Sequence, residues 1–321
     1  MTETVAIDRP SRHDLAGILN AAALPLAVVL LGLFFYIKAP VFLTPRNLLS
    51  ITVQVASLMT IAVPFAILLM AGKVDLSVGS LLGLCGVVAG LSFPVLGVAG
   101  AVVFTLLVGL AAGLVNGFLV SWLSMSPIIV TLGGLTLMRG LAQYLSPNPL
   151  FGFPESFSYI GYGVLFGVPY LTWIMLAVLV AGFAFMRLSP FGRHAVAIGV
   201  NERAAYLVGI RVKLTVMLLY AAVGVAAALA GLMTVARINS APSGTLGVGM
   251  ELSVLTAVLL GGVPFTGGRG SLPRVALGVL LLGMLSNGLI LMNVPTEASL
   301  MLTGLVLIVA AALDVLRSRR S

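Results

Sequence analysis

The segment Gly72–Ser80, with the sequence GKVDLSVGS, places a lysine and an aspartate between two long apolar stretches. An ionisable residue at membrane depth is costly, and it commonly marks a substrate or ion pathway. A second acidic residue, Glu251, opens the string ELSV (251–254), which repeats DLSV at 75–78. Asp75 and Glu251 are therefore the first candidates for pathway groups, and the elements that carry them decide what they can do.

The composition indicates an all-α integral membrane protein. Of the 321 residues, 60% are hydrophobic and 8% are charged, and the mean hydropathy is +1.19. Since about 20 apolar residues cross a bilayer as a helix, the sequence predicts about ten transmembrane helices. These are expected at 15–37, 48–71, 76–93, 95–123, 127–145, 164–187, 213–236, 251–264, 274–293 and 297–316. The first is too long for a signal peptide and is expected to remain as an uncleaved span.

Lysine and arginine accumulate on cytoplasmic loops, so their positions predict the orientation. With the N-terminus inside, ten crossings place 13 of the 17 cationic residues in the cytoplasm and three outside, with Arg139 within a span. The predicted organisation is a cytoplasmic tail at 1–14, a transmembrane domain at 15–316 and a second cytoplasmic tail at 317–321. Within the domain, 188–212 is expected inside, and 146–163 and 238–249 are expected outside.

Several functions are disfavoured by what the sequence lacks. Its net charge of +8 is spread over loop ends, which topology explains better than nucleic-acid binding. The single cysteine, Cys85, excludes disulfides within the chain, and only two histidines, His13 and His194, argue against a metal cage. No nucleophile and base set is visible either, so we expect no catalytic, cofactor-binding or metal-ligating residues.

The chain repeats itself in one consistent order. The acidic strings are 176 residues apart, and Asn116-Gly117 is echoed by Asn287-Gly288 at an offset of 171. Five helices followed by five would invert the second half relative to the first, and glycine-interrupted segments at corresponding places point to a pathway between such halves. Chance is an equal alternative for matches this short.

The loop 187–213 is expected to contain a short helix. Asn201 can cap its N-terminus, Glu202 suits the dipole at its first turn, and Gly209 supplies a stop. Ala204 and Ala205, with Leu207 and Val208, would give it a small apolar face. Such a helix could lie on anionic lipid or fit the groove of a partner protein.

Three motifs together carry a resemblance to a known family. GKVDLSVGS, SPFGRHAVAIGVNERAAYLVGI and LLGGVPFTGGRGS followed by SNGLIL resemble the permease subunits of bacterial ABC importers for ribose, xylose, arabinose and related monosaccharides. The similarity runs from about Leu48 to the C-terminus. The chain departs from the family pattern at Ala71, where a second glycine is usual, and at 253–256, where a string like Asp-Ala-Ile-Ala is usual. The second departure lies near the expected pathway and leaves the substrate open.

The resemblance implies a multi-pass protein of the bacterial inner membrane that works as a dimer, with itself or with a related permease. Its partners would be two ATPase subunits and a periplasmic or extracellular sugar-binding protein, with lipid around it. ATP would bind only the partner subunits, because the glycine-rich stretch 262–269 lacks the lysine and hydroxyl of a P-loop. Asn201, Glu202, Ala204, Ala205 and Gly209 would then receive the ATPase.

The pathway candidates each have a structural alternative. Asp75 could cap the third span and pair with Lys73, and Arg139 could line the route or contact a carbonyl. The asparagines commonly join helices in membranes rather than contact ligands. The complete candidate set is Asp75, Ser77, Gly79, Asn116, Glu251, Ser253, Thr256, Gly262 and Asn287.

The expected function is import of a monosaccharide or related polyol into the cytoplasm. Alternatives are a permease for nucleosides or branched-chain amino acids, and an ion-coupled secondary transporter, which should carry more carboxylates within its spans. The sequence does not choose among sugars.

Overall fold

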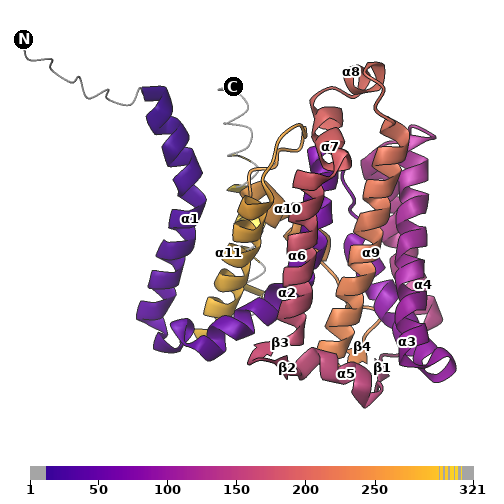
Figure 1. Cartoon of the computed structure of the whole chain (residues 1–321). Helices are drawn as coiled ribbons and strands as arrows, with labels where there is room; N and C mark the ends of the chain where they lie inside the picture. Colours follow the sequence, from indigo (N-terminus) through magenta and orange to yellow (C-terminus); the bar gives the residue numbers. More distant parts are fainter. Residues whose placement is uncertain are drawn as a thin grey trace, which may run out of the picture.

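The computed structural model describes residues 12–295 and, beyond them, 297–298, 301–302, 304–306, 308–309 and 312. Its long helices are α1 (Arg12–Lys38), α2 (Pro45–Met70), α3 (Val78–Ser121), α4 (Pro127–Leu145), α6 (Tyr170–Leu188), α9 (Val212–Ile238) and α11 (Leu272–Leu291). Its shorter helices are η1 (Pro40–Leu43), α5 (Glu155–Tyr162), α7 (Pro190–Val200), α8 (Glu202–Leu207) and α10 (Met250–Leu260). The long helices run roughly side by side (Figure 1).

The centre of the bundle is formed by α2, α9 and the first part of α3. The most apolar stretch of α2 is 78% buried and that of α9 is 72% buried, whereas those of α4 and α6 are only 22% buried. Bulky side chains such as Tyr220, Phe65 and Met59 fill this centre. The helices at the periphery expose apolar surface, as expected where lipid is the surrounding solvent.

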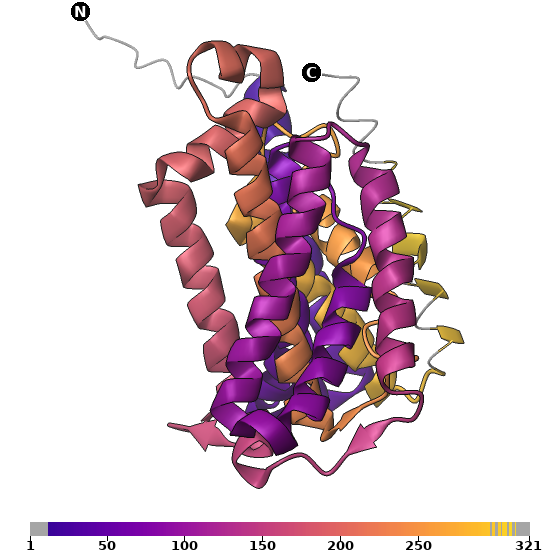
Figure 2. The ribbon, with the colours of Figure 1, turned by 90° about the vertical axis from the view of Figure 1, so that its right-hand side faces the viewer.

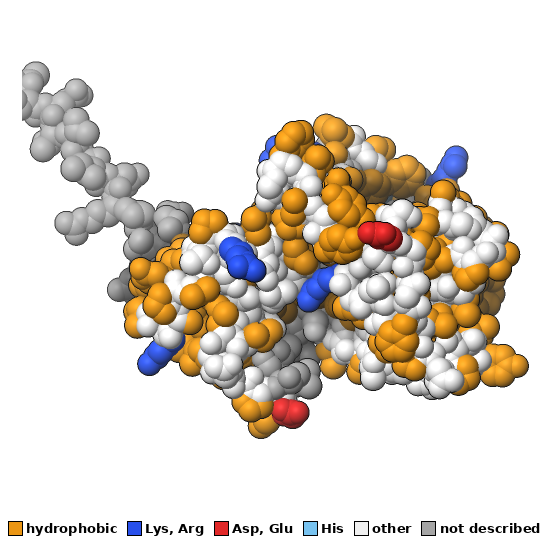
Figure 3. All heavy atoms as spheres, turned by 90° about the horizontal axis from the view of Figure 1, so that it is seen from below, with side chains coloured by type: hydrophobic (Ala, Val, Ile, Leu, Met, Phe, Trp, Pro, Cys, Tyr) orange, Lys and Arg blue, Asp and Glu red, His pale blue; other side chains and the backbone are white. Residues whose placement is uncertain are grey.

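The two ends of the bundle differ. One end, the β end, carries α5 and two short antiparallel ribbons: β1 (Leu150–Phe151) with β4 (Ser240–Ala241), and β2 (Val164–Leu165) with β3 (Val168–Pro169). The opposite end, the α8 end, carries α7 and α8 (Figure 1). Viewed from the β end, charged side chains are few and scattered among hydrophobic and uncharged ones (Figure 3).

Helix α3 contains two of the predicted spans. At Gly97, where φ is +64°, it turns back sharply, and its two legs pack together with the Cys85 thiol 3.9 Å from the Thr105 carbonyl oxygen (Figure 2). A positive φ is readily adopted only by glycine, which explains the turn at this residue.

The structure is that of a multi-pass membrane protein, as the composition predicts. Within the part of the chain that the structure describes, six helices are long and apolar enough to cross a bilayer, and α1 and α10 include shorter apolar stretches. The first nine predicted stretches each fall mainly on a helix, while half of 297–316 lies outside the described residues. The same is true of most of the tail 1–14 and of all of 317–321.

One loop assignment needs correction. The predicted external loop 238–249 does not lie wholly outside, because Ser243 is 3% exposed and Leu246 is 5% exposed. Its first residues pair in β4 at the β end, and the remainder runs into the bundle toward α10. The sequence suggested a loop because 239–249 has few apolar residues, but glycines at 247 and 249 let it pack inside.

Candidate translocation site

The first acidic segment, 71–77, is a non-helical stretch that enters the bundle from the α8 end, between α2 and α3 (Figure 2). Asp75 is fully buried there. Its Oδ1 accepts the backbone N–H of Ser77 at 2.9 Å and the Ser77 hydroxyl at 2.6 Å. Asp75 therefore fixes the turn that starts α3, which supports the capping alternative.

Two neighbouring side chains hold this turn in place. Asn116, on the second leg of α3, donates from Nδ2 to the Ser77 hydroxyl oxygen at 3.0 Å. Tyr220 of α9 donates its hydroxyl to the Val74 carbonyl oxygen at 2.8 Å. The structure thus brings Asp75, Ser77 and Asn116 together, as the sequence alone could not establish. Tyr220 was missed, because a lone tyrosine in an apolar helix carries no distinguishing signal.

The expected pairing of Asp75 with Lys73 is wrong. Lys73 Nζ lies 2.9 Å from Glu202 Oε2, at the N-terminus of α8. A buried aspartate held by the first turn of α3 faces inward, whereas the lysine side chain reaches the polar α8 end. Segment 71–77 therefore connects the buried turn to the surface helix α8.

The second acidic segment approaches from the opposite end. Residues 239–249 run inward from the β end, and α10 then begins with Glu251 in its first turn. At about 1.5 Å per residue the 11 residues of α10 span only about 16 Å, roughly half of a hydrocarbon core. Two helices thus begin inside the bundle after non-helical segments that come from opposite ends.

The starts of α3 and α10 are packed against each other. A Cβ at Gly79 would collide with Glu251 Oε2 and with the Gly247 carbonyl oxygen. The same side of α3 presents Gly83 to Leu246, so α3 receives the inward segment along a glycine face. Gly79 is therefore at the junction of the two helices, where no side chain fits.

Both acidic residues keep one unsatisfied oxygen. Asp75 Oδ2 and Glu251 Oε2 are buried without a hydrogen-bond partner among the described residues. A buried unpaired carboxylate oxygen is costly, and helix N-termini with such groups can bind polar substrates. We call the set Asp75, Ser77, Gly79, Asn116 and Glu251 the helix-start junction.

Arg139 of α4 adjoins the helix-start junction without pairing with Glu251. Its guanidinium Nη1 donates to the Leu246 carbonyl oxygen at 2.6 Å, and the side chain is half-buried. The carbonyl contact was one of the two alternatives for this residue. Arg139 thus holds the inward segment 239–249 against α4.

Three further pathway candidates have different surroundings from those expected. The hydroxyls of Ser253 and Thr256 donate to backbone carbonyls of their own helix, Gly249 at 3.1 Å and Leu252 at 2.6 Å. Gly262 has φ +80° and open space around its Cβ position, so it serves a turn rather than a close contact. Among the described residues, neither hydroxyl makes a hydrogen bond to a member of the junction.

The hydrogen-bond partners of Asn287 lie outside the helix-start junction. It exchanges hydrogen bonds with Asn47, at 2.9 and 3.2 Å, and Asn47 also donates to the Phe42 carbonyl oxygen at 2.8 Å. This pair joins α11 to the start of α2. The repeat-related asparagines therefore have unlike surroundings, and Asn287 connects helices as the structural alternative expects.

At the α8 end, the short helix has the predicted caps. Asn201 Oδ1 accepts the Ala204 N–H at 2.9 Å, and Gly209 ends the helix with φ +87°. The backbone N–H groups of Gly209 and Ile210 donate to Tyr206 and Ala205, the bond pattern of a Schellman motif.

The predicted apolar face of α8 needs correction. Ala205 is only 4% exposed, whereas Ala204 is exposed, Leu207 is 75% exposed and Val208 is 78% exposed. Ala205 packs inward because the cap geometry turns its side of the helix toward the bundle. The exposed surface instead includes Tyr206, which is 70% exposed.

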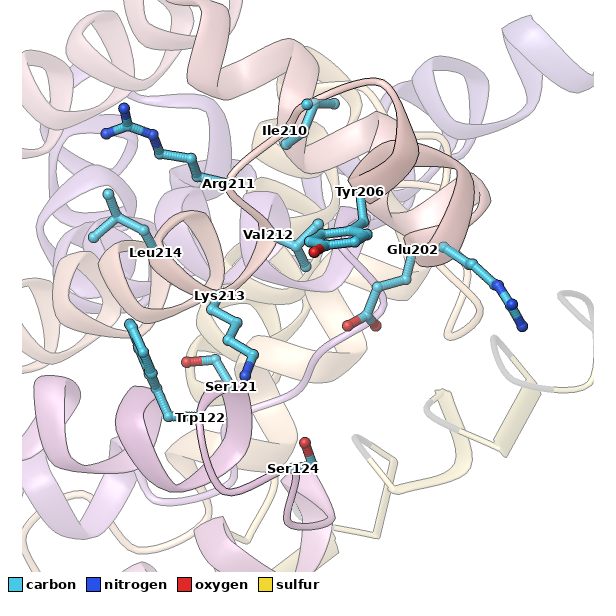
Figure 4. Close-up of a pocket in the computed structure, with 12 residues that line it drawn as sticks. Ser121, Trp122, Ser124, Glu202, Tyr206, Ile210, Arg211, Val212, Lys213 and Leu214 are labelled. Atoms are coloured by element: carbon cyan, nitrogen blue, oxygen red, sulfur yellow. The ribbon is translucent and has the colours of Figure 1, made fainter.

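A cavity of about 950 Å³ lies beside α8. Figure 4 shows that its lining residues come from α8, from the start of α9 and from the end of α3 with the following turn. Lys213 Nζ lies 5.4 Å from the centre of the Trp122 ring, which places a cation over an aromatic face. The arginines 203 and 211 also line this cavity, which we call the α8 groove.

Comparison with known proteins gives the family. Residues 47–311 match the family described as "Branched-chain amino acid transport system / permease component". The chain belongs to this family. It is 34% identical over 293 residues to the ribose import permease protein of Bacillus subtilis, with 90% of this chain and 91% of that protein covered. No solved structure matches the chain.

Other relatives transport related compounds, according to their names. The L-arabinose ABC transporter permease protein of Azospirillum brasilense is 34% identical over 309 residues, covering 94% of this chain and 89% of the relative. The D-allose transport system permease protein of Escherichia coli is 33% identical over 297 residues, covering 91% and 90%. The resemblance that the three sequence motifs indicate is confirmed, and the chain is a permease subunit rather than an enzyme.

Proposed function

We propose that this chain is the membrane subunit of an ATP-driven importer that moves a monosaccharide or related polyol into the cytoplasm. The relatives named for ribose, arabinose and allose import support this substrate class. The single structural observation that carries the proposal is the meeting of two internal helix starts at Gly79 and Glu251. Helix starts inside a bundle present N–H groups and carboxylates at membrane depth, where a hydroxyl-rich substrate must pass.

We also propose ten spans arranged as two inverted halves of five. In the first half, a non-helical segment enters from the α8 end and α3 follows it. In the second half, a non-helical segment enters from the β end and α10 follows it. Opposite directions at corresponding places support the inversion that the repeated strings suggest.

The α8 groove is proposed as the face that receives the ATPase. Asn201 caps α8, Glu202 pairs with Lys73, and Gly209 stops the helix, so the helix has a fixed attachment. The Lys73 pair connects α8 directly to the segment that ends at Asp75. A force on α8 would therefore reach the helix-start junction through a short stretch of backbone.

The contact is proposed to extend from the groove, which Tyr206 lines, onto the exposed side of α8 with Ala204, Leu207 and Val208. Ala205 supports the helix from within, since it is buried in this chain. Enlarging Ala204 would then disturb the partner contact, whereas enlarging Ala205 would displace α8 itself. The two variants separate docking from folding when ATPase co-purification is compared with thermal stability.

The α8 end is proposed to face the cytoplasm, with both termini on that side. The charge distribution supports this orientation, because the loop 188–212 and the stretch 262–274 carry arginines at that end. A single cysteine at Ala197, in a Cys85→Ser background, should be labelled by an impermeant thiol reagent only from the cytoplasm. Labelling from the periplasm of intact cells would reverse the orientation.

The partners are proposed to be ATPase subunits, a sugar-binding protein and a second permease subunit, identical or related. Reconstitution of the complex in proteoliposomes tests the function. ATP-dependent uptake of radiolabelled ribose, arabinose or allose is expected. Uptake of leucine or uridine in place of sugars would support the alternatives within the family, and uptake driven by an ion gradient without ATP would reject the importer mechanism.

A further inference from the structure

A second cavity lies between α2, α6 and α9, within the membrane part of the bundle. Its volume is about 650 Å³. Helices α6 and α9 both pack on α2, and residues of all three helices line the crevice. Sixteen of its 18 lining residues are apolar or glycine, and the other two are Thr60 and Thr215.

The crevice opens sideways toward the membrane. Ala181 of α6 and Ala222 of α9 are exposed on its two walls, and Leu218 is 42% exposed. Deeper lining residues such as Leu219 are buried. A hydrocarbon chain can therefore enter from the bilayer without crossing a polar layer.

The crevice is long enough to span one leaflet and to reach past the bilayer midplane. Along α9 the lining runs from Thr215 to Leu229, which is about 21 Å at 1.5 Å per residue. Half of a hydrocarbon core is about 15 Å thick. Thr215 lies in the first turn of α9, so the crevice begins at the α8 end of the bundle.

Among the described residues that line the crevice, Thr215 has the one side-chain hydroxyl without a hydrogen-bond partner. The residue is 1% exposed, and its hydroxyl oxygen has no hydrogen-bond partner among the described residues. The other threonine, Thr60, donates to the Ala56 carbonyl oxygen at 2.8 Å and needs no ligand. Burying a hydroxyl without a hydrogen-bond partner costs free energy. A ligand that brings a hydrogen-bond acceptor would remove this cost.

We propose that the crevice binds an acyl chain of a membrane phospholipid, with the ester carbonyl oxygen accepting a hydrogen bond from Thr215. The apolar walls match the chain, and the hydroxyl stands where an ester group lies. The bound chain fills the space between α6, which leads into α7 and α8, and the central helix α9. The lipid thus braces the connection between the α8 end and the core.

The test is native mass spectrometry of the full-length protein, purified from vesicles of phosphatidylethanolamine and phosphatidylglycerol. We expect a retained phospholipid on each chain after the annular lipid is removed. Ala181→Phe and Ala222→Phe, which fill the crevice from opposite walls, should lose it. The matched control is Ala177→Phe, which enlarges an exposed alanine one turn earlier on α6, outside the crevice, and should retain the lipid.

The hydroxyl is tested separately. Thr215→Val should weaken retention about two- to tenfold, the worth of one net hydrogen bond, whereas Thr215→Ser should retain the lipid. Equal retention in the crevice-filled variants and in Ala177→Phe would overturn the proposal. So would a wild-type protein without bound phospholipid, or a dimer that only the crevice-filled variants disrupt, since a second copy would then occupy the crevice.

Discussion

The two acidic helix starts correspond in sequence but differ in their surroundings. Asp75 is fully buried, and its Oδ1 is used to fix the turn at Ser77. Glu251 is half-buried at the opposite helix start, and its side chain makes no hydrogen bond to the described residues. The carboxylate of Asp75 therefore has a structural task at its helix start, whereas no such task is seen for the carboxylate of Glu251 among the described residues.

The segments before them differ as well. The stretch 71–77 is short and is tied down by Tyr220 and by the Lys73 pair. The stretch 239–249 is longer, contains two glycines with positive φ, and is held to α4 by Arg139. The first half therefore supplies a fixed support, and the second half supplies the more adaptable wall of the proposed route.

The largest expected effect is at the contact between the two halves. Gly79→Val should abolish uptake and lower the melting temperature, because a side chain there collides with the Gly247 carbonyl and Glu251. Uptake and thermal unfolding of the purified protein measure both effects. Gly133→Val is the control, since this glycine of α4 has open space around its Cβ position. Full uptake by the Gly79 variant would show that the helix starts do not meet there.

A smaller loss is expected when the structural carboxylate is removed. Asp75→Ala leaves the Ser77 N–H and hydroxyl without their acceptor, at a cost of about 1–3 kcal/mol. The protein should unfold at a lower temperature, and uptake should fall in proportion to the folded protein in the membrane. A normal melting temperature with abolished uptake would instead assign Asp75 to the pathway.

Much of this arrangement was predictable from local sequence. Hydropathy located the membrane helices, and Asn201 and Gly209 marked the ends of α8, because caps depend on neighbouring residues alone. The repeated strings pointed to Asp75 and Glu251 for the same reason. Each of these features depends on residues that are close together in the sequence.

The rest depends on contacts between distant segments. The Lys73 pair with Glu202 crosses 129 residues, and the Asn47 pair with Asn287 crosses 240, so neither is visible in one sequence. The inward course of 239–249 depends on the glycine face of α3, which lies in another part of the chain. The hydrophobic periodicity of a helix predicts that one of its faces is buried, but it does not identify the segment that packs against that face.

A substitution at the other carboxylate tests whether Glu251 contacts the substrate. Glu251→Gln keeps the size of the side chain and removes its charge, so folding should be unaffected. Uptake should fall about tenfold if the carboxylate accepts hydrogen bonds from a sugar, since a bond to a charged acceptor contributes about 1.5–3 kcal/mol and a bond to the neutral amide oxygen of Gln only about 0.5–1.5 kcal/mol. The measurement is initial uptake at equal amounts of membrane protein. Unchanged uptake would remove Glu251 from the route.

The smallest effects are expected at the repeated asparagines, and they should again differ between the halves. Asn116→Ala removes the bond to Ser77 and should lower uptake modestly, because the turn at Asp75 loses one support. Asn287→Ala removes the bonds to Asn47 and should cost about 0.6–1.7 kcal/mol of stability without changing uptake per folded molecule. A double-mutant cycle of Asn47 and Asn287, followed by thermal unfolding, isolates that pair. If Asn287→Ala lowered uptake as much as Asn116→Ala at equal stability, the two asparagines would share one role, and the division between a structural and a substrate-facing half would have to be given up.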